Sequence, residues 1–194
     1  MFRIFLSLVV ADVLVLLGAG ILGLSAENER GAARHLGLGV FASILTCLIH
    51  AVAFTYFTAT GKMMRQAINL GQLDARLDRE IRGLKQRVGR AVAPAILTCI
   101  ATVATGAVAT RVFGTSALSP ASWHLLAAGV MLLVNVAAFV AEADLIARNR
   151  ALMDGVFSSY QRVREQARAA AADAPRNGPP GGQESTEIDA PRSA

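Results

Sequence analysis

Charged and aromatic side chains are scarce in this chain. Of its 194 residues, 17% are charged and 6% are aromatic, whereas 54% are hydrophobic. Soluble domains carry about 25% charged residues, so the composition indicates a membrane protein.

Motifs of nucleotide-binding and catalytic sites are also missing. The sequence has no G-x-x-x-x-G-K-[ST], G-x-S-x-G or H-E-x-x-H motif, which disfavours a P-loop enzyme, an α/β-hydrolase and a zinc protease. The two cysteines, Cys47 and Cys99, lie in apolar runs without metal-ligand spacing, and we interpret them as buried, reduced thiols. An enzyme is therefore disfavoured.

Four long apolar runs are present, at about 4–24, 36–58, 91–111 and 123–145. A helix of about 20 residues crosses a hydrocarbon core roughly 30 Å thick, so each run predicts a membrane span. A cleaved signal peptide is the alternative for the first run, but that run is too long and contains Asp12. Pro94 is expected in the first turn of the third span, where a missing N–H costs little.

The basic residues gather between and after these runs. If both termini are cytoplasmic, 16 of the 19 Lys and Arg residues lie on the cytoplasmic side. Because Lys and Arg are retained on that side, we expect this topology, in a bacterial inner membrane. The same pattern explains the basic pI without nucleic acid as a partner.

Two amphipathic segments are expected in the cytoplasm. Residues 62–90 repeat apolar side chains every three or four positions, which predicts one long helical arm between the second and third spans. The fourth span continues with the same periodicity to about residue 172, and its apolar face is expected to pack against the arm. We therefore predict an all-α bundle of four antiparallel transmembrane helices over 1–172, and a disordered tail over 173–194.

Polar side chains within the spans are the first candidate site: Asp12, His50, Asn135 and Glu142. Ionisable groups are costly in a membrane and are often functional. Asp12 and His50 lie at matching depth, so they could pair as a proton or cation relay or as a structural clasp. The clasp is favoured, since no titratable groups continue toward the outer face. Glu142 is also interpreted as part of a solvated helix end.

Two histidines form the second candidate site. His35 and His124 fall at the outer ends of their spans, where two imidazoles could hold haem or a metal. The alternative is that both are interfacial polar caps, since no other ligand motif supports a cofactor. We therefore expect no cofactor, with haem as the alternative.

A third candidate is the segment at the inner end of the second span: Phe54, Tyr56, Thr60, Gly61 and Lys62. It could make a specific inner-face contact or belong to an ordinary aromatic belt.

Three functions remain open from the sequence, of which the first is favoured and the other two are alternatives. The first is a non-catalytic scaffold or accessory subunit, with membrane lipid and either a second copy or another membrane protein as partners. The second is a small transporter or proton-coupled component that uses Asp12 and His50. The third is a membrane cytochrome that uses His35 and His124.

Overall fold

The computed structural model of the chain describes residues 2–109 and 120–173. These residues form four helices and no strand: α1 Phe2–Leu24, α2 Glu29–Gly71, α3 Ala75–Ala109 and α4 Pro120–Asp173. The predicted all-α fold with four long helices is confirmed. Of the predicted tail, Asp173 ends α4 and the remainder lies outside the described residues.

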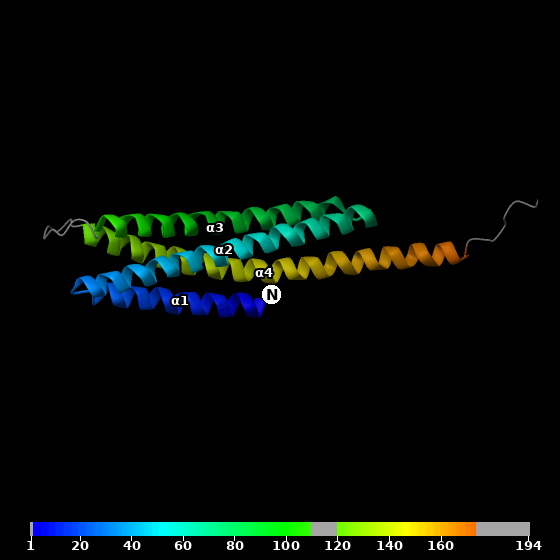
Figure 1. Cartoon of the computed structure of the whole chain (residues 1–194). Coiled ribbons are helices and arrows are strands. Elements are labelled where there is room, and N and C mark those ends of the chain that lie inside the picture. The colour runs from blue at the N-terminus through cyan, green and yellow to red at the C-terminus, as the bar shows by residue number, and fades with distance from the viewer. Residues whose placement is uncertain (1, 110–119, 174–194) are drawn as a thin grey trace, which may run out of the picture.

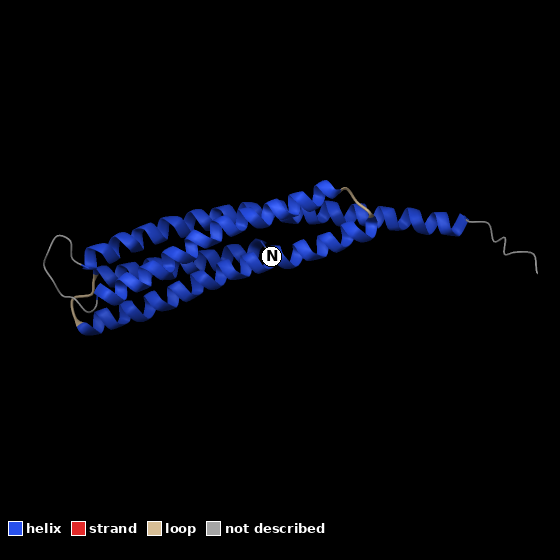
Figure 2. Ribbon diagram, turned by 90° about the horizontal axis from the view of Figure 1, so that it is seen from above, coloured by secondary structure: helices blue, strands red, loops and turns tan. Residues whose placement is uncertain are grey.

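The four helices lie side by side in an elongated bundle (Figures 1 and 2). The α1–α2 turn lies at one end, together with the last residues of α3 and the first of α4 (Figure 1). The α2–α3 turn lies toward the opposite end, and α4 continues beyond it (Figure 1). α2 and α4 contact each other and both flanking helices, whereas α1 makes no contact with α3.

The helices differ in length, and this difference divides the bundle into two parts. At 1.5 Å per residue, α1 is about 35 Å long and α4 about 80 Å. The N-terminal end of α1 therefore lies part-way along the bundle (Figure 1). Beyond it, α2, α3 and α4 continue as a three-helix arm.

The predicted single helix over 62–90 is wrong, because a turn divides it. α2 ends at Gly71, Gln72 adopts a left-handed conformation with φ 49°, and its N–H donates to Ile68 O. Asp74 Oδ1 then accepts from Arg76 N at 2.7 Å at the start of α3. Residues 62–90 thus form a hairpin of two helices, each continuous with a predicted span. Pro94 lies inside α3 rather than in a first turn.

The hairpin over residues 62–90 and the extension of α4 pack together, as predicted. Met64 and Ile68 of α2, Ile81 of α3 and Val156 of α4 form one buried apolar cluster. Gly71 leaves room for Tyr160, because a Cβ on this glycine would lie 3.0 Å from Tyr160 Cδ2. Val163, which the periodicity of the sequence also predicts on this face of α4, is 38% exposed.

All four helices are long and apolar enough to cross a membrane. Leucine, isoleucine and valine side chains remain exposed around the bundle, including Leu14, Ile44, Leu97 and Leu133. Such a surface would be unfavourable in water and is normal in contact with lipid. The chain has the architecture of an integral membrane protein.

Candidate functional site

The structure brings His35 of α2 and His124 of α4 together near the end of the bundle that contains the α1–α2 turn. Their ring centroids are 5.8 Å apart, and the ring planes meet at 68°. The two histidines are 89 positions apart in the sequence. The sequence identified both residues, and the structure adds that they are neighbours.

Hydrogen bonds determine which ring nitrogen of each histidine carries the hydrogen. His35 Nδ1 lies 2.9 Å from Ala19 O, and a carbonyl oxygen can only accept. His124 Nδ1 lies 3.4 Å from Thr105 Oγ1, whose hydroxyl hydrogen is donated to Thr102 O. Both rings therefore carry hydrogen on Nδ1, which leaves the Nε2 lone pair of each neutral ring for a ligand.

Two glycines allow the histidines to pack closely against neighbouring helices. A Cβ on Gly23 would lie 2.7 Å from His35 Cε1, and a Cβ on Gly106 would lie 2.9 Å from His124 Cε1. Distances under 3 Å would force the rings to shift. Gly23 and Gly106 therefore leave the space that the two imidazole rings occupy.

Both histidines line a cavity of about 870 Å³. All four helices contribute walls, mainly of leucine, alanine, glycine and valine, with Thr102, Ser43 and Asn28 as uncharged polar exceptions. Glu27 and Glu29 line it at the α1–α2 turn. Its volume and apolar walls are typical of sites for cofactors and other small molecules.

A second polar site lies deeper in the bundle, on His50 of α2. His50 Nδ1 lies 2.7 Å from Glu142 Oε1, and His50 Nε2 lies 2.9 Å from Asn135 Oδ1. All three side chains are 0% exposed. The imidazole also stacks on Phe139 at 4.7 Å between ring centroids, so side chains of α4 contact one face of the ring and both of its nitrogens.

The orientation of Asn135 determines the proton count of this site. Its Nδ2 donates to Met131 O at 2.8 Å, so its Oδ1 faces His50 and must accept from Nε2–H. One further proton then lies between His50 Nδ1 and Glu142 Oε1. The pair is neutral as a whole, either as imidazolium and carboxylate or as imidazole and carboxylic acid.

The predicted direct pair of Asp12 and His50 is not formed. Thr46 Oγ1 donates to the Asp12 carboxyl group, at 3.0 Å from Oδ1 and 2.9 Å from Oδ2. Thr46 lies one helical turn from His50 on α2, so Asp12 occupies the adjacent level of the bundle. Asp12 thereby joins α1 to α2, while His50 joins α2 to α4.

The interpretation of Glu142 as part of a solvated helix end is wrong. Its side chain is completely buried because it faces His50, and its Oε2 has no hydrogen-bond partner among the described residues. The solvated pair is Asp144 and Arg148, whose Oδ2 and Nε are 2.9 Å apart. Sequence position near the end of a span did not distinguish these two acids, because only the helix contacts decide which side faces inward.

A buried cluster of Leu16, Ala42, Cys99 and Met131 lies between the two polar sites, and all of them except Cys99 also line the cavity. Threonines of α3 run past this cluster, because Asn135 Nδ2 donates to Thr98 Oγ1 at 3.4 Å and Thr102 Oγ1 donates to Thr98 O at 2.8 Å. No Asp, Glu, Lys, Arg or His side chain of the described residues belongs to the cluster. Among the described residues, no group of three or more His, Cys, Asp or Glu side chains is placed to hold a metal ion.

Thr60 and Gly61 of the inner-face segment pack within the bundle, whereas Phe54 and Lys62 are exposed. Thr60 is buried and accepts from Asn149 Nδ2 at 3.0 Å. A Cβ on Gly61 would lie 3.1 Å from Ile81 Cγ2, and Lys85 Nζ lies 5.5 Å from the centroid of the Phe54 ring. The sequence analysis did not identify Asn149. A single asparagine on the apolar face of α4 could have indicated a buried hydrogen bond.

Comparisons of the chain with protein-family models, with curated proteins and with solved structures find no match. Function is therefore argued from the geometry of these two sites.

Proposed function

We propose that this chain is a four-span protein of a bacterial inner membrane, with antiparallel helices and both termini in the cytoplasm. The distribution of Lys and Arg supports this topology. In this placement the cavity with His35 and His124 opens in the outer half of the membrane, and the three-helix arm lies in the cytoplasm.

Within this topology, we propose that the protein is a membrane cytochrome in which His35 and His124 would hold one haem. The observation that carries the proposal is the meeting of two imidazoles in one large apolar cavity. The donors fit the group, because each ring is held by its Nδ1–H and offers Nε2. Metal-ligating histidines almost always donate their other N–H in this way.

Bound haem would supply one-electron exchange. The protein's own residues would do three things. Ala19 O and Thr105 Oγ1 would hold the two rings in the ligating tautomer, and Gly23 and Gly106 would leave the rings their space. The apolar walls would exclude water, which tunes the reduction potential of a haem.

The test is an absorption spectrum of the full chain, purified after expression with a haem supply, followed by haemin titration. We expect a Soret band typical of two imidazole ligands, with one haem per chain. His35→Gln and His124→Gln should each weaken haemin binding at least about tenfold, because each removes an imidazole that would hold the haem. Ser43→Ala is the matched control, since Ser43 lines the same cavity without an imidazole.

Circular dichroism of the variants would show that they keep their helices. Absence of a Soret band and of haemin binding by the wild-type chain would refute the cytochrome. Haemin binding that survives both histidine substitutions would refute this site.

A scaffold or accessory subunit is the second candidate, favoured by the end of α4. Every residue of α4 from 161 to 173 is exposed, and this part extends past the α2–α3 turn (Figure 2). A segment this short is marginal as a helix in water by itself, so a partner that packs on it would stabilise it. Crosslinking and native mass in mild detergent test this candidate, and a clean monomer without partners would contradict it.

A further inference from the structure

A groove between α3 and α4 in the arm combines basic and apolar side chains. Its volume is about 600 Å³, and Leu84 and Leu152 form part of its lining together with Gly83 and Ala151. The glycine and the alanine leave the space between the helices open. Leu84 is buried, so the groove has an apolar floor.

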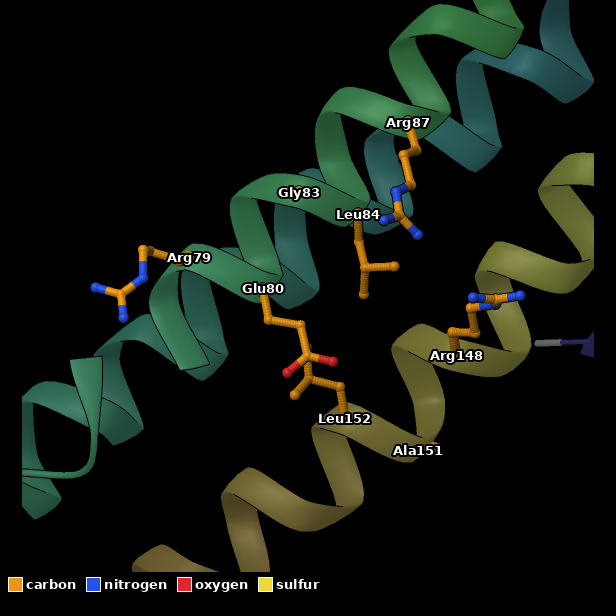
Figure 3. Close-up of a pocket in the computed structure, with 8 residues that line it drawn as sticks. All are labelled: Arg79, Glu80, Gly83, Leu84, Arg87, Arg148, Ala151 and Leu152. Carbon is orange, nitrogen blue, oxygen red and sulfur yellow. The ribbon is translucent and has the colours of Figure 1, made fainter. Parts of the chain in front are cut away.

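Two arginines from different helices extend over this floor. Figure 3 shows Arg87 reaching from α3 toward α4, and Arg148 lying on α4 on the facing side. Arg79 extends away from α4, and Glu80 reaches toward Leu152 at the other end of the groove (Figure 3).

The charges of the two arginines are not balanced equally. Arg148 Nε pairs with Asp144 Oδ2 at 2.9 Å, whereas Arg87 forms no ion pair with any described residue. All N–H donors of the Arg87 guanidinium are therefore available to a ligand. Arg148 still has N–H donors that its ion pair with Asp144 does not use. Arginine forks match the geometry of phosphate oxygens.

The groove lies where lipid headgroups would be in the proposed topology. Arg87 precedes the apolar run of α3, which begins near Ala91, by one turn, and Arg148 follows Asp144 by one turn. Basic pockets between membrane helices on the cytoplasmic side bind anionic headgroups. This inference rests on the proposed membrane placement and is independent of the haem site.

We propose that this groove binds the phosphate of a phosphodiester, supplied by an anionic glycerophospholipid of the inner leaflet. Arg87 and Arg148 bind the phosphate, and the acyl chains follow the apolar surface of α3 and α4 into the membrane. Glu80 accepts hydrogen bonds from the far end of the headgroup. A headgroup that ends in hydroxyls, such as that of phosphatidylglycerol, satisfies both ends, whereas the quaternary ammonium of phosphatidylcholine has no N–H or O–H to donate.

The experiment is native mass spectrometry of the full chain in mild detergent, titrated with phosphatidylglycerol or phosphatidylcholine. We expect one tightly bound phosphatidylglycerol per chain and weaker phosphatidylcholine. Arg87→Gln should weaken phosphatidylglycerol binding about fivefold, and Arg87→Gln with Arg148→Gln about 25-fold, because each arginine contributes to attraction for anionic lipid. Arg162→Gln with Arg164→Gln removes the same charge from the exposed end of α4 and should leave binding unchanged.

Glycerol phosphate, added as a competitor, distinguishes the two sources of phosphate. Weak competition supports the lipid, whereas displacement at equal concentration shows that a free phosphate ester is the ligand and overturns the lipid assignment. Equal binding of the two lipids, or equal losses in the groove variant and in the control, would overturn the site itself. Since Arg87 has no ion pair to lose, its single substitution tests binding without disturbing the fold.

Discussion

The fully buried polar side chains are concentrated in the middle of the bundle, where their hydrogen bonds join different helices. Thr46 joins α2 to Asp12 of α1, and His50 joins α2 to Glu142 and Asn135 of α4. A hydrogen-bonded buried pair contributes little net free energy when it is complete. Loss of one partner costs about 3–5 kcal/mol, because the other is left uncompensated.

At this scale we predict losses of stability of different size for two substitutions at one contact. His50→Ala leaves Glu142 without its partner and should lower the free energy of unfolding by about 3–5 kcal/mol. Glu142→Gln keeps the shape and can donate an N–H to Nδ1 of a neutral His50, so its cost should be under about 1.5 kcal/mol. Reversible unfolding in mixed micelles, followed by circular dichroism, measures both.

Asp144→Asn is the control for this pair of variants, because it removes a carboxylate from an exposed ion pair two residues from Glu142. We expect a change within about 0.5 kcal/mol. If His50→Ala cost no more than this control, His50 would not hold the bundle together.

The sequence identified most of these residues but not their partners. Asp12, His50, Asn135 and Glu142 stand out because ionisable and amide groups are rare in apolar runs. Depth along the helices then suggested a pair of Asp12 and His50. Rotation of each helix about its own axis decides which groups meet, and a count of residues along one helix contains no information about the rotation of its neighbour.

At the scale of the elements, the α2–α3 turn determines the shape of the arm. The apolar periodicity of 62–90 continues on both sides of the turn because both helices contribute to the same cluster with α4. Gly71 is the last residue of α2, but Gln72 has the left-handed backbone. Gly71 is needed for a different reason, the close approach of Tyr160.

This turn provides a prediction on backbone conformation. A non-glycine residue in the left-handed region is strained by roughly 1 kcal/mol, so Gln72→Gly should stabilise the arm and slow amide hydrogen exchange around residues 66–80. Gln86→Gly, in the exposed interior of α3, should instead destabilise its helix by about 1 kcal/mol. Faster exchange in Gln72→Gly than in the wild type would contradict the turn geometry.

For the whole molecule, the proposed topology predicts which residues reagents can reach from outside the cell. In a background with Cys47→Ala and Cys99→Ala, Glu27→Cys in the α1–α2 turn should react with a membrane-impermeant maleimide in intact cells. Ser159→Cys in the arm should react only after permeabilisation, because positively charged segments remain in the cytoplasm. Labelling of Ser159→Cys in intact cells would contradict the proposed topology.

The sequence by itself determined the helical fold and the number of long apolar helices, because apolar length and the positions of charged residues are local properties of the chain. It also pointed to His35, His124 and the buried polar residues, because such side chains are conspicuous in an apolar run. Only the tertiary structure decided which of them meet: His35 with His124 at one cavity, His50 with Glu142, and Asp12 with Thr46. Those contacts depend on the rotation and crossing of packed helices, which are determined by all the side chains of the bundle together.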